Sequence, residues 1–364
     1  MPCRRRQARR RRRVRVDRSA GPLPMSALLE VEDLRVEFRI QDGIVRAVDG
    51  VSCSVDAGKT LAIVGGAGSG KTVASMALLG LTPGPCAHIS GRVAFEGRDL
   101  LGLVGHELRS IRGEEIAMVV QDRSSSLHPF YKVGDQLIEA IVTHRQVSRA
   151  AARDRTIDLL ELLGIPEPHH RVDQYPDELS PSMRQRTTIA MALANEPQLL
   201  VADDPTSGLD LTVQAEILEL LKRVRERLGM AIIFVCRDLA VAAEIADDIC
   251  VVYAGRIVER APTELILESP QHPYTWALFK SAPQLGAPRD EELAPNPGRP
   301  PSLIHRPSGC LFHPRCPYVR DEHRRVDPAL QPVAGQDGHE VACLLEPEAR
   351  TRTWQELKAG ARAR

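Results

Sequence analysis

A glycine-rich run that ends in lysine and threonine has the spacing of a phosphate-binding loop. Its residues are Gly65, Gly66, Ala67, Gly68, Ser69, Gly70, Lys71 and Thr72. Glycines let successive backbone N–H groups point at phosphate oxygens that larger side chains would obstruct. In such a loop the lysine reaches the β- and γ-phosphates, and the threonine hydroxyl binds Mg²⁺. The alternative, a glycine-rich turn that binds nothing, is weaker because a strand pattern precedes the run and a helical pattern follows it.

Two adjacent aspartates follow an apolar stretch further along the chain. Residues 199–202 are apolar, and Asp203 and Asp204 come directly after them. A carboxylate at the end of a buried strand can hold Mg²⁺ through water, and this is the role predicted for Asp203. The alternative role, an acidic helix cap, is less favoured because the strand would deliver Asp203 to the same sheet edge as the glycine-rich loop.

The elements that must position these residues are short apolar runs separated by helical stretches. The runs cover residues 59–65, 199–203, 230–235 and 249–253, and a helix is expected over 71–81. Residues 133–194 carry apolar side chains at helical spacing. This alternation predicts an α/β fold with a mostly parallel sheet covered on both faces. Residues 281–308 contain seven prolines, which indicates a linker or an irregular wrap.

The composition of the 364-residue chain is that of an ordinary globular protein. Hydrophobic residues make up 43% and charged residues 26%, which excludes wholesale disorder and collagen-like order. No run approaches 18 apolar residues, so we expect no membrane-spanning helix. The charged N-terminus is not followed by the apolar region of a secretory signal. The eight cysteines are too scattered for a disulfide scaffold and fit a reduced, cytosolic setting.

The first 24 residues differ from the rest in charge. They contain ten arginines and one aspartate, whereas the whole chain has no net charge. Without hydrophobic periodicity, residues 1–24 are predicted to be disordered. Three explanations remain open: translation that starts at Met25, a basic tail that touches anionic lipid, and nonspecific contact with nucleic acid. The acidic remainder of the chain makes nucleic acid the weakest of the three, and no specific nucleic-acid partner is expected.

Further motifs resemble those of ABC-transporter ATPases, in the same order. They are Gln121 after an apolar strand, Ser180 before a basic helix, the run from Asp203 to Thr206, the run from Ser207 to Asp210, and Arg237-Asp238. The last third is similar to the ATP-binding subunits of oligopeptide, dipeptide and nickel importers. That similarity rests on the run from His272 to Thr275 and on the spacing of Cys310, Cys316 and Cys343. The resemblance covers about residues 28–345.

The resemblance implies a P-loop (RecA-like) ABC ATPase core with an inserted helical subdomain and an irregular, cysteine-containing C-terminal extension. We expect a disordered leader over 1–24, an ATP-binding domain over 25–265 and an importer-type extension over 266–364. The helical subdomain is expected at about 122–194. The chain would work with a second ATPase subunit in a head-to-tail dimer, with two membrane permeases and with an extracytoplasmic solute-binding protein. Its place would be peripheral, on the cytoplasmic face of the membrane.

The same resemblance assigns roles to individual side chains. Phe38 would stack on adenine, and Gln121 would sense Mg²⁺ and the γ-phosphate; the segment after Gln121 would meet the membrane partner. Thr72, Gln121 and Asp203 form the expected Mg²⁺ site. Ser180, with the turn that contains Ser182, would cap the γ-phosphate of an ATP held by the second subunit, and Asp210 is also placed among the nucleotide contacts.

Four positions depart from the family pattern. Asp204 stands where the family has a glutamate that acts as base or orients water, and Arg237 stands where it has a switch histidine. Together with Gln121 they form the predicted catalytic group. Ser180-Pro181-Ser182 replaces Ser-Gly-Gly, and Arg123 replaces a proline. The chain is therefore expected to bind ATP and to hydrolyse it slowly for peptide uptake. The alternative is a catalytically silent regulatory subunit. A soluble ABC protein of DNA repair or translation is disfavoured because the chain lacks tandem ATPase domains.

A Cys/His set in the last part of the chain suggests a second cofactor. Cys310, Cys316, His323 and Cys343 stand where the similar importers have four cysteines that can hold an iron–sulfur cluster. Three thiolates and one imidazole also suit Zn²⁺. The alternative is that the cysteines are small buried hydrophobic residues in a proline-rich wrap.

Overall fold

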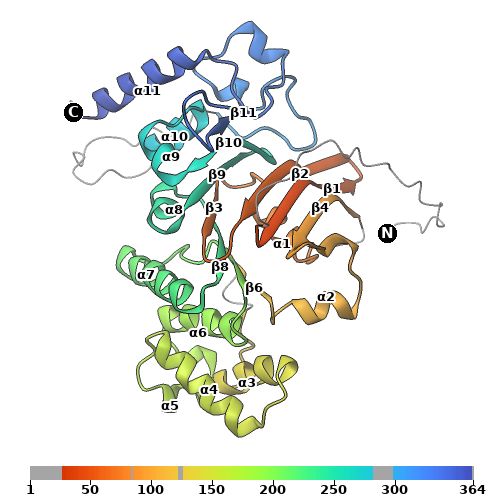
Figure 1. Cartoon of the computed structure of the whole chain (residues 1–364), viewed down its shortest axis with the longest axis vertical. Coiled ribbons are helices and arrows are strands. Elements are labelled where there is room, and N and C mark those ends of the chain that lie inside the picture. Colours follow the sequence, from red (N-terminus) through yellow and green to blue (C-terminus); the bar gives the residue numbers. More distant parts are fainter. Residues whose placement is uncertain (1–26, 83, 85, 122–125, 282–297, 363–364) are drawn as a thin grey trace, which may run out of the picture.

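The protein is built around two β-sheets, as the computed structural model in Figure 1 shows. The structure describes residues 27–82, 84, 86–121, 126–281 and 298–362. A four-stranded antiparallel sheet has the strand order β2-β1-β4-β5. Its strands are β1 (Leu29–Ile40), β2 (Gly43–Val55), β4 (Ala87–Phe95) and β5 (Arg98–Asp99). The predicted leader over 1–24 and Arg123 lie outside the described residues.

The second sheet has eight strands in the order β11-β12-β10-β9-β3-β8-β7-β6. Its strands are β3 (Thr60–Val64), β6 (Ile116–Val119), β7 (Leu199–Asp203), β8 (Ala231–Cys236), β9 (Asp248–Tyr253), β10 (Arg256–Pro262), β11 (Gln331–Pro332) and β12 (Glu340–Val341). The five strands from β9 to β6 run parallel, and β10, β12 and β11 continue the sheet antiparallel. Every residue of β3, β7 and β8 is buried, as expected for parallel strands covered on both faces.

Eleven α-helices occur in the described part of the chain. They are α1 (Lys71–Leu78), α2 (His106–Ile111), α3 (Val133–His144), α4 (Arg149–Leu162), α5 (Pro168–Arg171), α6 (Pro181–Leu193), α7 (Leu211–Leu228), α8 (Leu239–Ile245), α9 (Thr263–Glu268), α10 (Pro273–Ser281) and α11 (Pro347–Arg362). None of the described helices is long and apolar enough to cross a membrane.

Two apolar clusters lie on opposite faces of the eight-stranded sheet. One joins the sheet to α1 and to the four-stranded sheet, and the other joins it to α7 and α8. One face is therefore covered by helices, as predicted, while the other is covered mainly by α1 and the second sheet. The sequence interpretation did not include this second sheet, whose strands are only half-buried.

The predicted elements are confirmed, with shifts at their ends. The strand expected over 199–203 is β7. The strands expected over 59–65 and 230–235 differ from β3 and β8 by one residue at each end, and that over 249–253 differs from β9 by one residue at its start. The helix expected over 71–81 ends at Leu78. Gly80 has φ 60°, its N–H donates to Ala77 O at 3.0 Å, and the Leu81 N–H donates to Met76 O at 2.8 Å. This pair of hydrogen bonds is a Schellman motif, which stops the helix.

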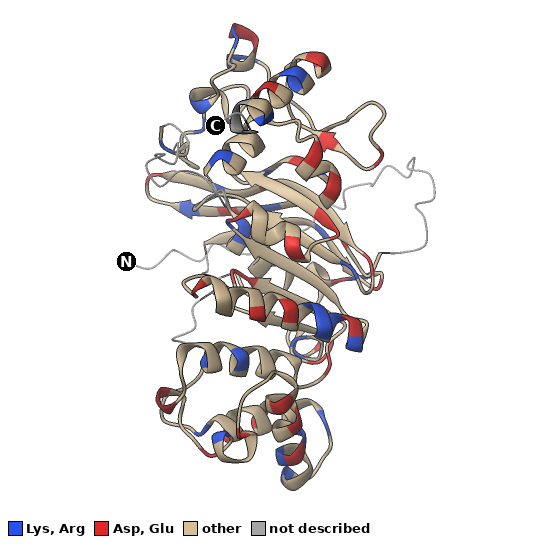
Figure 2. Ribbon diagram, turned by 90° about the vertical axis from the view of Figure 1, so that its left-hand side faces the viewer, with Lys and Arg blue, Asp and Glu red and all other residues tan. Residues whose placement is uncertain are grey.

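The helical stretch predicted over 133–194 consists of α3, α4, α5 and α6, which form one end of the molecule (Figure 1). The C-terminal extension forms the other end. It is irregular between 298 and 330 apart from two short 3₁₀ turns, but it also contains the helices α10 and α11. Acidic and basic residues are interspersed over both ends on the face that Figure 2 presents.

Candidate functional site

The glycine-rich loop connects β3 to α1 and is packed so tightly that only glycine fits at two positions. A Cβ atom at Gly65 would lie 2.2 Å from the backbone oxygen of Val252 on β9. Gly70 has φ 99°, and a Cβ atom there would lie 2.1 Å from the backbone oxygen of Ala47 on β2. The loop therefore lies tightly between strands of both sheets, where a side chain at either position would clash with backbone.

The ammonium group of Lys71 is held inside this loop. Its Nζ donates to Gly65 O at 2.7 Å, to Gly66 O at 2.8 Å and to Ser69 Oγ at 3.2 Å. The residue is buried, and burial lowers the pKa of Lys71, with the charge of Arg237 adding to the effect. An anion bound beside Lys71 would compensate this buried positive charge.

Asp203 is buried at the end of β7. Neither carboxylate oxygen receives a hydrogen bond of normal geometry from any residue that the structure describes. Burial raises the pKa of Asp203; the nearby Thr72 hydroxyl opposes this effect, and the charge of Asp204 adds to it. Buried carboxylate oxygens without donors need a compensating cation, and hard oxygen ligands are what Mg²⁺ prefers. Thr72 and Asp203 therefore fit a Mg²⁺ ion.

The three predicted catalytic side chains meet at one carboxylate oxygen. Gln121 Nε2 donates to Asp204 Oδ2 at 3.1 Å, and Arg237 Nε lies 3.2 Å from the same oxygen. The Asp204 side chain is 11% exposed, whereas that of Arg237 is 53% exposed. Asp204 also has φ 50°, an uncommon left-handed conformation for a residue other than glycine. The Asp204 carboxylate is thus already engaged by two donor groups, those of Gln121 and Arg237.

These side chains line a cavity of about 350 Å³. Ala67 to Thr72, Gln121, Asp203, Asp204 and Arg237 form its polar end, and Phe38, Val45 and Leu303 contribute apolar side chains. Phe38 and Val45 are directly paired across β1 and β2. Gly65 and Gly66 do not line this cavity, and their backbone oxygens hold Lys71 instead. The structure therefore brings together most of the nucleotide-contacting residues predicted from the sequence.

Three predicted residues lie outside the cavity, at helix N-termini. Ser180 begins α6, where its Oγ accepts from the Met183 N–H at 3.2 Å and lies 3.0 Å from Ser182 Oγ. Asp210 begins α7 and accepts from the Val213 N–H at 3.0 Å. Pro181 is accommodated at the first position of α6, as predicted. Within this chain, Ser180 and Asp210 cap helices and Ser182 lies in the first turn of α6, and none of the three lines the glycine-rich loop's cavity.

Tyr274 is a contact of the glycine-rich loop that the sequence interpretation missed. The Gly66 N–H donates to its hydroxyl oxygen at 2.7 Å, across 208 positions of the chain. The ring is buried, and burial raises the pKa of Tyr274. Tyr274 belongs to the run from His272 to Thr275, which the sequence analysis identified as a motif. Nothing in that motif predicts a contact with the glycine-rich loop.

The predicted metal-ligand set in the extension is not formed. Among the residues that the structure describes, no three His, Cys, Asp or Glu side chains are placed to hold a metal ion. His323 is buried and its Nδ1 accepts from the Arg320 N–H at 3.0 Å, while Cys310 is buried in the large apolar cluster. Burial raises the pKa of Cys310, Cys316 and Cys343. As placed, the residues Cys310, Cys316, His323 and Cys343 do not fit an iron–sulfur cluster or Zn²⁺.

Comparisons with known proteins match separate parts of the chain to two families. The family described as ABC transporter matches residues 48–207, and the family described as oligopeptide/dipeptide transporter, C-terminal region, matches residues 258–322. The oligopeptide transport ATP-binding protein OppD of Bacillus subtilis is 45% identical over 327 residues, which are 89% of this chain and 91% of that protein. The chain belongs to the OppD/DppD family of ABC-transporter ATP-binding proteins.

Further relatives agree with this assignment. The dipeptide transport ATP-binding protein DppD of Escherichia coli is 44% identical to this OppD/DppD-family chain over 317 residues, which are 87% of this chain and 96% of that protein. A dimeric bacterial ABC transporter cassette, 24% identical, superposes with a TM-score of 0.58 over 65% of this chain and 98% of its own. The structure of cbiO1 of Clostridium perfringens, part of an ABC transporter complex, is 26% identical and superposes with a TM-score of 0.57. The match covers 68% of this chain and 93% of cbiO1. The predicted ABC ATPase fold is confirmed, and the chain is an ATP-binding subunit of an ABC importer.

Proposed function

We propose that this OppD/DppD-family subunit binds ATP with Mg²⁺ in the described cavity and hydrolyses it slowly to drive the uptake of oligopeptides, dipeptides or similar small solutes. Lys71 would neutralise the β- and γ-phosphates, while Thr72, Gln121 and Asp203 would hold Mg²⁺. Phe38 would stack on the base. The observation that carries the proposal of slow turnover is the shared oxygen: Asp204 Oδ2 accepts from Gln121 and pairs with Arg237.

Two physical arguments connect this geometry to slow turnover. Aspartate is one methylene shorter than glutamate, and a reacting group displaced by about 1 Å can cost of order a hundredfold in rate. Arginine is always charged and accepts no hydrogen bond, so Arg237 cannot act between water, γ-phosphate and base as a neutral imidazole does. It can donate to a γ-phosphate, which favours binding. The same ion pair supports the second candidate function, a regulatory subunit that binds ATP without hydrolysing it.

The partners belong to the proposal as well. Ser180, Ser182 and Asp210 lie at the N-termini of α6 and α7, outside the chain's own cavity. Helix N-termini favour anions, so the start of α6, with Ser180 and Ser182, suits the γ-phosphate of an ATP held by a second subunit in a head-to-tail dimer. Asp210, itself an anion, would only hold the start of α7 at that interface. We propose a heterodimer on the cytoplasmic face of the membrane, docked on two permeases that receive solute from an extracytoplasmic binding protein.

The test is single-turnover ATP hydrolysis by the assembled importer whose partner ATPase has lost its own strand-ending carboxylates. The matched control is Asp203→Asn in this chain, which removes the proposed Mg²⁺ site. Phosphate release above that control, at a slow rate, is the expected result. Tight ATP binding without any release above the control would favour the regulatory subunit. Failure of the unmodified chain to bind ATP would contradict both functions.

A further inference from the structure

Residues 302–306, here called the strap, connect the C-terminal extension to the hairpin of β1 and β2. The Arg46 N–H on β2 donates to the backbone oxygen of Leu303 at 3.2 Å. A Cβ atom at Gly43, at the hairpin turn, would lie 3.0 Å from Ile304 Cγ2. Inside the strap, Ser302 Oγ accepts from the N–H groups of Ile304 and His305 at 3.2 and 3.1 Å. The strap is thus a defined turn that follows the hairpin closely.

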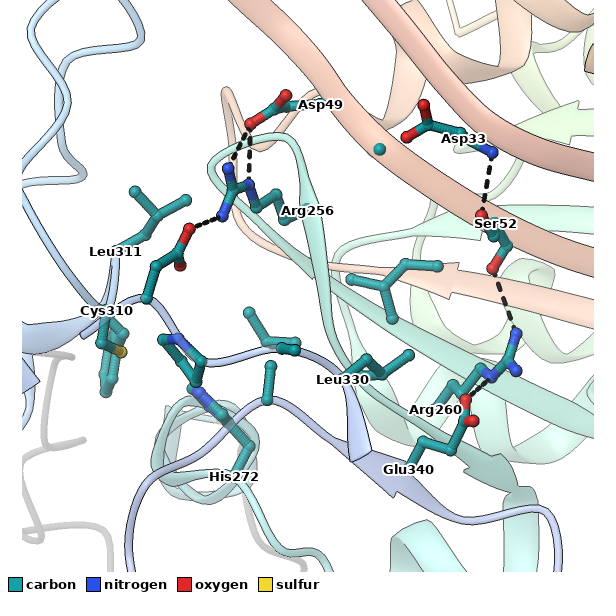
Figure 3. Close-up of a pocket in the computed structure, with 18 of the residues that line it drawn as sticks. Asp33, Asp49, Ser52, Arg256, Arg260, His272, Cys310, Leu311, Leu330 and Glu340 are labelled. Atoms are coloured by element: carbon teal, nitrogen blue, oxygen red, sulfur yellow. Dashed lines mark hydrogen bonds and ion pairs between the residues drawn. The ribbon is translucent and has the colours of Figure 1, made fainter. Parts of the chain in front are cut away.

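Arg306 fixes the end of the strap to the ATPase core. Its side chain is only 10% exposed, and its Nη2 donates to Arg46 O at 2.6 Å and to Ala254 O at 3.0 Å. Its Nη1 pairs with Asp49 of β2, which also pairs with Arg256 of β10. Figure 3 shows Asp49 and Arg256 joined on one side of a second cavity. The paired charges of Arg306 and Asp49 are buried, so they tie the end of the strap to β2.

Leu303 is the strap residue that reaches the nucleotide cavity. Its side chain is half-buried, packs on the large apolar cluster and lines the cavity together with Phe38 and Val45. The phosphate-binding end of the cavity is polar, because it consists of the glycine-rich loop and the acidic strand end. An aromatic ring and two aliphatic side chains instead suit the flat, largely apolar faces of a purine.

We propose that Leu303 forms one wall of the base-binding end of this cavity, so that the C-terminal extension contributes directly to ATP affinity. The inference rests on the proposed function, since it takes the cavity to be the ATP site. Leu303 would contact the base together with Phe38, while the phosphates are held by backbone N–H groups and Lys71 on the far side. Nothing in the strap would touch the phosphates.

The experiment measures equilibrium binding of ATP and of inorganic tripolyphosphate, each with Mg²⁺, to the full-length chain. Leu303→Ala removes apolar contact area from the base alone, so its Kd for ATP should rise by about five- to twentyfold. Its Kd for tripolyphosphate, which has no base, should not change. Leu303→Met, which keeps an apolar side chain of similar volume, should restore most of the ATP affinity.

The matched control is Leu330→Ala. Leu330 is also a half-buried leucine of the extension, but it lines the second cavity (Figure 3) and not the nucleotide cavity. Its replacement should leave both affinities unchanged.

Three outcomes would count against the inference. If the unmodified chain binds ATP and Leu303→Ala binds it equally well, Leu303 does not contact the base. The proposed function would be unaffected by that result. If Leu303→Ala weakens tripolyphosphate as much as ATP, the substitution acts on the whole site and the base contact is refuted. If the unmodified chain does not bind ATP, the proposed function fails first and the inference falls with it.

Discussion

At the scale of single residues, the proposed slow turnover depends on what occupies Asp204 Oδ2. The oxygen accepts from Gln121 at 3.1 Å and lies 3.2 Å from Arg237 Nε. A base that is engaged by a permanent cation holds its negative charge but is less available to a water molecule. Arg237 also lines the cavity, so its positive charge lies close to where the γ-phosphate would be.

The first prediction concerns this group. In the assembled importer, Asp204→Glu combined with Arg237→His should raise the rate of ATP hydrolysis by about ten- to a hundredfold, because the longer carboxylate reaches the water and the imidazole can accept a hydrogen bond. Steady-state phosphate release with saturating ATP measures the effect. Arg237→His alone should give a smaller increase. A double variant as slow as the unmodified protein would show that neither residue limits turnover.

The second prediction concerns Tyr274. Tyr274→Phe removes only the hydroxyl that accepts from the Gly66 N–H, so the loop loses one hydrogen bond while the ring packing is kept. One hydrogen bond of this kind contributes about 1 kcal/mol, so the Kd for ATP should rise by about three- to tenfold. Calorimetric titration measures it. Tyr318→Phe is the control. The Tyr318 ring packs on Trp276, which belongs to α10 like Tyr274, but Tyr318 makes no contact of this kind with the glycine-rich loop. Equal ATP affinity in all three proteins would contradict a role for Tyr274 in holding the loop.

At the scale of elements, Glu259 of β10 holds the start of α10. Its buried carboxylate accepts from the N–H groups of Gln271 and His272 and from the Thr275 hydroxyl, and it lies 2.8 Å from His339 Nε2. Glu259 and His339 are fully buried. A carboxylate at a helix N-terminus is favoured by the unpaired N–H groups there. This cap sets the direction of α10 and therefore the position of Tyr274.

The third prediction follows from this cap. Glu259→Ala leaves several buried donors without an acceptor, so the free energy of unfolding should fall by about 3–5 kcal/mol. Glu340→Ala is the matched control, because Glu340 pairs with Arg260 at a partly exposed site and should cost about 1 kcal/mol or less. Chemical denaturation of both variants measures the difference. A loss for Glu259→Ala no larger than that for Glu340→Ala would refute the cap.

The sequence predicted the elements that have a local signal and missed those that depend on distant contacts. β7 and the loop around Lys71 were predictable because an uninterrupted apolar run and a glycine spacing are local patterns. The early end of the helix at Leu78 was not, because it depends on the left-handed conformation of Gly80. Tyr274 and Leu303 escaped prediction because they reach the site from more than 200 positions away in the chain.

The extension shows the same limit in a different way. The resemblance to importer subunits suggested a metal site formed by Cys310, Cys316, His323 and Cys343, with buried cysteines as the alternative. The structure does not assemble a metal site among the residues it describes. The three thiols lie near enough to influence one another electrostatically, but they are not placed as ligands of one ion. The alternative, three small buried hydrophobic residues, holds for Cys310, whereas Cys316 and Cys343 are only half-buried.

At the scale of the whole molecule, stability depends on pH through His272. The imidazole is buried, and burial lowers the pKa of His272 to about 4. The ring is therefore neutral in the folded protein, whereas in the unfolded chain it takes up a proton near its ordinary value of 6.5. The unfolded state binds more protons between these values, so this contribution to stability is complete above about pH 6.5 and is lost as the pH falls toward 4.

The fourth prediction is the size of that loss. Between pH 7 and pH 5, His272 alone should lower the free energy of unfolding by about 2 kcal/mol. His272→Asn keeps an acceptor for the Tyr274 N–H but does not titrate, so its stability should change less over the same interval. Thermal unfolding of both proteins at the two pH values provides the measurement. An equal decrease in the two proteins would assign the pH dependence to other groups.

The pairing of β12 with β10 has a consequence for how this protein can be divided. Glu259 and Arg260 of β10 are registered with Val341 and Glu340 of β12, and the Ala342 N–H donates to Val258 O at 2.8 Å. A fragment that stops near residue 265 would leave the outer side of β10 as an open edge, with unsatisfied N–H and C=O groups that invite edge-to-edge aggregation. A chimaera that exchanges the extension between two such proteins would therefore have to exchange a strand of the central sheet as well.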